Sequence, residues 1–434
     1  MSWLFVAGFV ILFVGLLVSI ALHEIGHLLP AKLFNVRVTQ YMVGFGPTLW
    51  SRRRGETEYG IKWIPLGGYV RLVGMLPPRP SDDPNKLRRV STGPWQGLIE
   101  SARAAASEEI RPGDENRVFY RKPWWQKLII MTGGPAMNFV LAFVLFCVVA
   151  MGFGVQVLKP TVSSVSKCVI PTAEAGKRDC RPDDPLTPAA KAGIRPGDRI
   201  VAVGGVEVES WEEATRLIRA HGAGRTTIGI VRDGERMTLT VDLIAQNRPS
   251  LDDPDKIEKN VGFLGVTPTV VIERQGPGYV LNQMWELTTR TATAIVGIPE
   301  KMVGVWHAAF SGERRDPNGP IGIVGAGRIG GEIASSEIPL ENKIVVFINL
   351  LAGLNLAVGM FNLIPLLPLD GGHIAGAIWE AIKRGIARLL RRPTPGYVDV
   401  AKALPLTYVM ALLLLIMGGL LIYADLVNPV RILG

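Results

Sequence analysis

Charged residues are scarce in this 434-residue sequence, and cysteine is scarcer still. Asp, Glu, Lys and Arg make up 20% of the chain, whereas soluble globular proteins carry about 25%. Hydrophobic residues account for 48%, which excludes a disordered chain and argues against a protein that is soluble throughout. Three cysteines are too few for a scaffold stapled by disulfides.

Four uncharged stretches are long enough to cross a bilayer, since a spanning helix needs about 20 apolar residues. They cover residues 3–22, 128–158, 344–369 and 403–424. The third stretch contains asparagines and Pro365, so we expect its helix to be broken. The first stretch has no positively charged start and exceeds the apolar length of a signal peptide, so we interpret it as a retained helix.

Basic residues are concentrated in two of the connecting segments. The segment between the first two stretches contains many lysines and arginines, and the short segment before the fourth contains five, from Lys383 to Arg392. The positive-inside rule places both in the cytoplasm. Both termini and residues 159–343 are then extracytoplasmic. The net charge of +9 is thereby explained as a topology signal, and we expect no nucleic-acid partner.

The first apolar stretch ends in a metal-binding pattern, H-E-x-x-H, formed by His23, Glu24 and His27. Residues four apart share one face of a helix, so both imidazoles can reach one cation while Glu24 lies beside it as a general base. Zinc suits two imidazoles and a carboxylate, and it lowers the pKa of a water ligand to about 7. Ionisable groups inside a membrane segment usually mark function.

A third protein ligand is needed, and Asp370 is the carboxylate that borders the third stretch. Pro365 and Pro368 interrupt the helix just before it. Non-helical backbone at membrane depth is tolerated where it lines a cavity. We favour Asp370 as the third ligand; the alternatives are His373 and a third ligand that is neither of these residues.

These motifs together resemble the site-2 protease family of intramembrane zinc metalloproteases. The resemblance rests on the H-E-x-x-H pattern and on Asn362-x-x-Pro365-x-x-Pro368-Leu369-Asp370-Gly371. It extends to further segments like those of the bacterial branch that cleaves anti-sigma factors: Gly44-Phe45-Gly46-Pro47, Ile64 to Val70, Gly133 to Phe139, and Gly319 to Ile323. The likeness therefore covers most of the chain.

The resemblance implies one zinc ion held by His23, His27 and Asp370, with Glu24 as the general base. It also implies that asparagines near the aspartate, here Asn362 and less firmly Asn355, help to hold the substrate. The implied reaction is the second cut of regulated intramembrane proteolysis on a single-pass membrane protein. The implied substrates are an anti-sigma factor and remnant signal peptides.

Residues 36–75 alternate in a way that suits strands, with a turn at Arg53-Arg54-Gly55. A small sheet near the membrane would offer an open edge, to which an extended substrate could add by main-chain hydrogen bonds. The alternative is a purely structural hairpin. Residues 77–116 are rich in Pro, Ser, Ala and charge, and predict a lightly ordered insert.

The extracytoplasmic segment resembles one PDZ domain of the bacterial protease type, through residues 188–205, a helix over 211–221 and a hairpin turning at Asp233-Gly234. Such a domain either binds an extended peptide or excludes bulky substrates, and we leave both roles open. Cys168 and Cys180 lie in this segment, where an oxidising compartment permits a disulfide. Residues 279–310 predict a helix on the membrane surface.

We therefore predict a polytopic α-helical protein of the cell membrane with four transmembrane helices, a small cytoplasmic β-hairpin or sheet and one extracytoplasmic PDZ-like α+β domain. The active site is expected near the cytoplasmic side of the lipid bilayer. The segments expected along the chain are the first helix with H-E-x-x-H (1–35), the cytoplasmic loop (36–127), the second helix (128–158), the PDZ domain (159–250), a linker with the surface helix (251–343), the third helix with Asp370 (344–373), a cytoplasmic basic loop (374–402) and the fourth helix (403–425).

Two other functions are compatible with parts of this sequence. A transporter would use intramembrane His and Asp as an ion path, but no inverted repeat is visible. A catalytically silent scaffold would act through its PDZ domain, but the intact Glu24 argues against it.

Overall fold

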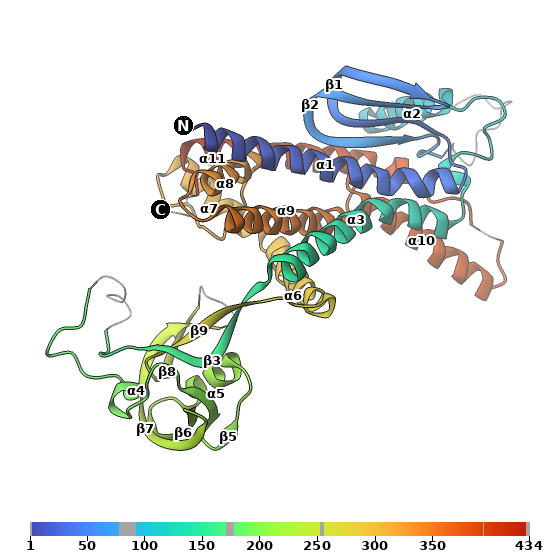
Figure 1. Ribbon diagram of the computed structural model, residues 1–434. Coiled ribbons are helices and arrows are strands. Elements are labelled where there is room, and N and C mark those ends of the chain that lie inside the picture. Colours follow the sequence, from blue (N-terminus) through green and yellow to red (C-terminus); the bar gives the residue numbers. More distant parts are fainter. Residues whose placement is uncertain (1, 78–92, 171–177, 252–255, 394, 431–434) are drawn as a thin grey trace. The chain divides into compact units, whose positions relative to one another are not determined.

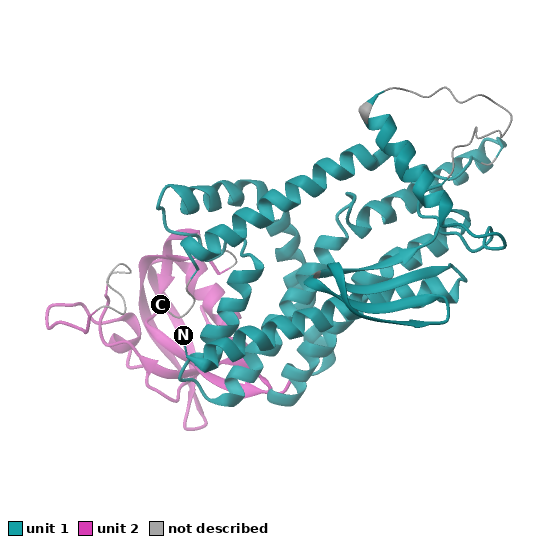
Figure 2. Ribbon diagram, turned by 90° about the horizontal axis from the view of Figure 1, so that it is seen from above, with its two compact units in different colours: residues 1–153, 276–434 teal, residues 154–275 magenta. Residues whose placement is uncertain are grey.

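The computed structural model describes residues 2–77, 93–170, 178–251, 256–393 and 395–430. The chain forms two compact units (Figure 2): residues 1–153 with 276–434, and residues 154–275. The first unit holds the apolar helices, and the second unit is an insertion within it.

Four helices in the described part of the chain are long and apolar enough to cross a membrane, as predicted. They are α1 (Trp3–Leu33), α3 (Trp124–Cys147) with its π-helical continuation η2 (Val148–Phe153), α9 (Leu340–Asn362), and α11 (Leu404–Val427) preceded by the 3-10 turn η3 (Val400–Ala403). Large apolar side chains such as Leu415, at 73% exposure, cover their outer faces. Lipid is the solvent that suits such a surface.

The third predicted helix differs from its expected range of 344–373. Helix α9 ends at Asn362, and Asp370 is the first residue of a separate helix, α10 (Asp370–Leu389). Proline has no backbone N–H to donate, so Pro365 and Pro368 separate the two helices. Asp370 thereby lies in the first turn of a helix, where backbone N–H groups favour a negative charge.

Helix α10 also replaces most of the cytoplasmic loop expected over 374–402. It buries Gly371, Ala377, Glu380 and Ala387 while its other residues stay exposed or partly exposed. Because this segment is rich in basic residues, the sequence indicated a loop, whereas the structure contains an amphipathic helix.

The second predicted helix also ends earlier than expected, because residues 155–158 belong to a strand.

Two further differences concern a segment expected to be a loop and a segment expected to be one helix. The insert expected over 77–116 contains α2 (Pro94–Glu108), followed by the 3-10 turn η1 (Phe119–Arg121); residues 78–92 of it lie outside the described part. The surface helix expected over 279–310 is two helices, α6 (Pro277–Val296) and α7 (Ile298–Phe310). Pro299 near their junction favours a helix start.

Within the first unit, α1 packs along α3 and along α8 (Ile323–Ser335), and α3 packs against α9 and α10 (Figure 1). Small residues allow these close approaches: a Cβ atom on Gly8 of α1 would lie 2.4 Å from the Gly330 carbonyl oxygen of α8. Membrane helices associate through such small-residue contacts.

Strands β1 (Val38–Arg54) and β2 (Thr57–Leu72) form the predicted sheet alongside α1 (Figure 1). Each strand bends, so that Tyr41 lies opposite both Val70 and Tyr59, and Tyr59 lies opposite both Tyr41 and Arg52. The sheet therefore has four segments side by side, in the order 68–72, 40–43, 58–61 and 50–54. Gly44 and Gly67, with φ of 92° and 97°, provide bends that side-chain-bearing residues disfavour.

The second unit contains a seven-stranded sheet in the order β8-β7-β6-β4-β3-β9, with β5 paired to β4. Helix α5 caps its own N-terminus through a capping box of Ser210 and Glu213. The elements are β3 (Val155–Val165), α4 (Pro188–Lys191), β4 (Arg199–Val203), β5 (Val206–Glu207), α5 (Trp211–His221), β6 (Gly224–Arg232), β7 (Glu235–Pro249), β8 (Ile257–Phe263) and β9 (Val266–Glu273).

This unit extends beyond the predicted domain of residues 159–250 at both ends. Strand β3 begins at Val155, and β8 and β9 add residues up to Glu273 to the same sheet. The core contains apolar side chains from β3, β4, β6, β7 and α5, including Ile200, Ile228 and Ile230, each 0% exposed. Cys168 and Cys180 form a disulfide in this unit, with their Cα atoms 5.8 Å apart.

Candidate metal centre

Helix α1 presents His23 and His27 on one face, one turn apart, with Glu24 between them. All three side chains are buried, at 9%, 6% and 8% exposure respectively. His27 Nδ1 lies 2.8 Å from the Ile130 carbonyl oxygen. A carbonyl only accepts, so Nδ1 carries the proton and donates, which leaves the Nε2 lone pair free for a cation.

Glycines of α3 let this helix pass directly against the imidazoles. A Cβ atom on Gly134 would lie 2.2 Å from His27 Nε2 and 2.6 Å from His23 Nε2. On the neighbouring residue Gly133, a Cβ atom would lie 2.0 Å from the Gly26 carbonyl oxygen. The Gly133-Gly134 pair is therefore explained by packing, since a side chain at either position would separate α3 from the histidines.

Asp370 reaches the same point from the first turn of α10. Its Oδ2 atom lies 3.3 Å from His23 Nε2 and 3.3 Å from His27 Nε2. The connection from α9 is tight here, because a Cβ atom on Gly371 would lie 2.1 Å from the Ile364 carbonyl oxygen. The prolines and glycines of this segment thus serve to turn the chain so that Asp370 faces α1.

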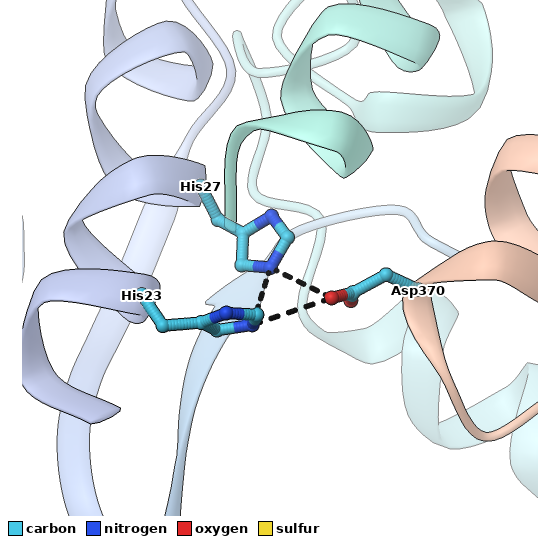
Figure 3. A group of neighbouring side chains, drawn as sticks. All are labelled: His23, His27 and Asp370. Atoms are coloured by element: carbon cyan, nitrogen blue, oxygen red, sulfur yellow. Dashed lines mark hydrogen bonds and ion pairs between the residues drawn. The ribbon is translucent and has the colours of Figure 1, made fainter. Parts of the chain in front are cut away.

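The three donor atoms form a nearly equilateral triangle (Figure 3). The two Nε2 atoms are 3.3 Å apart, the same distance that separates each from Asp370 Oδ2. Zinc–ligand bonds of about 2.0–2.1 Å at tetrahedral angles would separate neighbouring donors by about 3.3 Å. Two imidazoles and one carboxylate are also a donor set that zinc prefers. The residues therefore fit a zinc ion in both chemistry and spacing.

His373, the alternative third ligand, lies near but outside this triangle. Among the described residues, His23, His27 and Asp370 are the group whose donor atoms all lie within 4.8 Å of one another. His373 lines the same cavity one turn further along α10. The geometry favours Asp370.

A cavity of about 790 Å³ surrounds the triangle. Its wall is built by α1, α3, α9, the sheet segment 67–72, residues 321–326 and the turn before α10. The site residues predicted from the sequence all border this cavity: His23, Glu24, His27, Asn355, Asn362 and Asp370. The structure therefore brings these segments, far apart in the chain, to one place.

The small sheet borders the cavity with an edge segment. Segment 68–72 pairs on one side with 38–43, and the described residues provide no β-partner on its other side. Gly68 of this segment is so close to α1 that a Cβ atom would lie 2.9 Å from Glu24 Cγ. An open strand edge thus runs beside the predicted general base.

Tyr41 fastens the sheet to α1. Its hydroxyl donates a hydrogen bond to the Ala21 carbonyl oxygen at 2.8 Å. Burial, together with the nearby Glu24, raises the pKa of Tyr41 to about 12. The hydroxyl therefore keeps its proton over the physiological pH range and remains a donor.

Several buried polar groups of this unit were not singled out from the sequence. Ser19 and Asn138 line the cavity. Further away, Glu380 of α10 pairs with Lys127 and Arg384, at 2.6 Å each. For Ser19 and Asn138 the signal was a polar residue within an uncharged stretch, which indicates hydrogen bonding between helices as readily as a functional site.

A similar buried pair lies at the end of α11. Asp425 Oδ1 accepts from Arg315 at 2.5 Å, and Asp425 Oδ2 accepts from the backbone N–H groups of Gly322 and Gly325 at 2.9 and 2.8 Å. A carboxylate at a helix N-terminus satisfies N–H groups that lack partners within the helix. Asp425 therefore fixes the start of α8, next to residues 321–326 of the cavity wall.

Comparison with known proteins gives a consistent result. The family model for Peptidase family M50 matches residues 11–394. Zinc metalloprotease Rip1 of Mycobacterium tuberculosis is 35% identical over 443 residues, and the alignment covers 99% of both chains. Zinc metalloprotease Rip1 of Mycolicibacterium smegmatis is also 35% identical, with 99% of both chains covered. Metalloprotease MmpA of Caulobacter vibrioides is 29% identical, covering 87% of this chain and 88% of the relative.

Proposed function

The chain belongs to peptidase family M50 and is a zinc metalloprotease, and we propose that it cuts single-pass membrane proteins within or near the bilayer. The observation that carries this proposal is the triangle of His23, His27 and Asp370, with Glu24 beside it in one cavity. The four apolar helices support a multi-pass membrane protein.

His23, His27 and Asp370 would hold one zinc ion through Nε2, Nε2 and a carboxylate oxygen. When bound, zinc polarises the scissile carbonyl and lowers the pKa of water, which makes hydrolysis feasible at neutral pH. The hydrogen bond from His27 Nδ1 to Ile130 fixes the ring orientation and the tautomer. Because Gly134 has no side chain, the Nε2 atoms of both imidazole rings remain accessible to the cation.

Glu24 is the proposed general base. It borders the cavity and lies in the same turn of α1 as both histidines. Its carboxylate accepts a proton from the attacking water and later passes that proton to the leaving amine. One side chain thus performs both proton transfers.

The open edge of segment 68–72 is the proposed substrate-docking strand. A helical substrate hides its amide groups within its own hydrogen bonds and must unwind before hydrolysis. An unwound segment that adds to this edge exchanges helical hydrogen bonds for sheet hydrogen bonds. The close contact between Gly68 and Glu24 would bring the added strand next to the base.

Asn362 and Asn355 are proposed to hold the substrate near the scissile bond. Both line the cavity, as the family resemblance implies for asparagines near the aspartate. The proposed substrates are an anti-sigma factor, cut after an earlier external cut, and remnant signal peptides. We place residues 154–275 outside the cytoplasm as a PDZ-like unit that binds a peptide or excludes bulky ectodomains.

Cleavage of a single-pass anti-sigma factor without its ectodomain tests this function. Glu24→Gln should keep its zinc and lower the cleavage rate by at least about 10²-fold, because the proton acceptor is lost. The matched control is Glu300→Gln, at an exposed position of α7, which should cleave at the wild-type rate. Cleavage by Glu24→Gln near the wild-type rate would refute the base assignment.

A further inference from the structure

A layer of polar side chains lies one helical turn from the metal triangle. Ser19 precedes His23 by one turn of α1, and Asn138 follows Gly134 by one turn of α3. Asn355 of α9 completes the layer. Their exposures are 7%, 1% and 2%, and all three border the cavity. Buried polar groups in apolar helices call for partners.

The amide of Asn355 has a fixed orientation. Its Nδ2 donates to the Leu351 carbonyl oxygen at 2.8 Å and to Ser19 Oγ at 2.9 Å, while Ser19 Oγ donates to the Gly15 carbonyl oxygen at 3.0 Å. Since a carbonyl only accepts, the Asn355 nitrogen must face Leu351, and its Oδ1 faces the other way. This buried Oδ1 accepts no hydrogen bond within the described part of the chain.

In Asn138, by contrast, the buried atom that lacks a partner is the donor. Its Nδ2 is buried and has no acceptor among the described residues. Helix α9 approaches α3 at this point, because a Cβ atom on Gly359 would lie 3.3 Å from Asn138 Cβ. Gly359 is one turn from Asn355 on α9. The two asparagines therefore belong to facing surfaces of α3 and α9, within about one turn of each other.

The two residues that carry this unpaired donor and this unpaired acceptor thus border the same cavity. Leaving both unpaired costs free energy, because a buried polar group without a partner loses its hydrogen bonds to water. A ligand that offers one carbonyl and one N–H satisfies both. Every residue of an extended peptide except proline presents this pair, whatever its side chain.

We propose that Asn138 and Asn355 form a main-chain subsite next to the metal centre. Asn138 Nδ2 donates to a substrate carbonyl, and Asn355 Oδ1 accepts from a substrate N–H, on the unwound segment flanking the scissile bond. Ser19 is a positioning residue that holds the Asn355 amide. The subsite selects for exposed backbone rather than for sequence, and it rests on the proposed protease function.

The first test replaces Asn138 by Leu, which keeps the volume close and removes the donor. We expect kcat/KM to fall about 10- to 100-fold on substrates of different sequence, with unchanged zinc content and unchanged thermal unfolding. The matched control is Asn342→Leu, at an exposed position of α9, which should retain wild-type kcat/KM. Wild-type kcat/KM in Asn138→Leu, or loss of zinc from it, would overturn the subsite.

The second test needs no change to the enzyme. A synthetic substrate series replaces one backbone N–H at a time by an ester oxygen on either side of the cut bond. We expect one position to lower wild-type kcat/KM about 10-fold, and the same ester to have no effect on Asn355→Leu. Equal sensitivity in wild type and Asn355→Leu at every position would overturn the proposal. Failure of wild type to cleave any substrate would instead refute the protease function.

Discussion

Among the described residues, the basic groups that pair with the Asp370 carboxylate are the imidazoles of His23 and His27, and the surrounding helices are apolar. An isolated charge in such a setting is costly, and a cation is the partner that removes this cost. The same negative charge also strengthens the affinity of the histidines for the cation. Asp370 therefore links the two properties: without a bound cation its charge destabilises the site, and with one it raises the affinity for zinc.

Asp370→Asn should reduce the zinc content of the purified protein by at least about 10-fold, since a neutral amide oxygen is a poorer zinc ligand than a carboxylate. Metal analysis after gel filtration in detergent measures this. Asp242→Asn, at an exposed position of β7, should retain wild-type zinc. Unchanged zinc in Asp370→Asn would remove it from the ligand set.

Among single residues, the sequence identified the H-E-x-x-H pattern, Asp370 and the two asparagines before it, and it missed Ser19 and Asn138. His23, Glu24 and His27 were identifiable because their spacing matches a helical turn inside an apolar run. Asn138 was not, since an asparagine in a membrane helix more often bonds to a neighbouring helix. Its Nδ2 is buried without a partner among the described residues, which only the packed structure reveals.

Between elements, the contact of α1 with α3 positions the histidines. A Cβ atom on Gly26 would lie 2.2 Å from the Gly133 carbonyl oxygen, which is a backbone atom that side-chain rotation cannot relieve. The two helices therefore meet backbone to backbone, immediately beside His27. This contact depends on glycine at both positions.

Gly26→Ala should separate α1 from α3 and lower the free energy of unfolding by about 1–3 kcal/mol, as overpacked contacts do. Zinc content and cleavage should fall with it. Thermal unfolding in detergent and metal analysis measure the effect. Gly418→Ala in α11, where a Cβ atom would meet nothing within 4 Å, should behave as wild type. Wild-type stability of Gly26→Ala would contradict this account of the contact.

The existence of the long helices was predictable from length and apolar content, but their connections were not. Helix α10 was hidden because its basic residues indicated a loop, although its buried face includes Ala377 and Ala387. A small hairpin or sheet was expected, but not the bends at Gly44 and Gly67 that divide its two strands into four segments. Both outcomes depend on packing partners that are distant in the chain.

For the whole molecule, the inserted unit carries the evidence on orientation. The disulfide joins Cys168 to Cys180, and Cys147 of α3 is the third cysteine of the chain. Stable disulfides require an oxidising compartment. A bond between these residues in cells would support the extracytoplasmic location proposed for residues 154–275.

Mass-tagging of thiols in denatured protein tests the disulfide. Without reduction, only Cys147 should react, giving one tag per chain; after reduction, the three cysteines of the sequence should give three tags. Protein from cells should be alkylated before lysis, so that no bond forms during purification. Three tags on unreduced protein would contradict both the bond and the support that it gives to the orientation.

The four apolar helices and a separate β-sheet region were predicted from the sequence, whereas the limits of the inserted unit were not. Strands β8 and β9 lie beyond the segment that resembles a PDZ domain, and they join its sheet only through pairing with β7 and β3. Strands β3 and β9 lie at opposite ends of the inserted unit, and pairing between strands so far apart in sequence leaves little local signal.

The ends of the insertion have a further consequence. Val155 lies opposite Glu273 in the β3–β9 pair, and residues paired in this way are about 4.5–5.5 Å apart. The two ends of the inserted unit therefore lie side by side, and a short glycine linker would bridge the gap left by its removal. A different recognition domain could consequently be grafted in place of residues 154–275 while the residues of the metal centre are left unchanged.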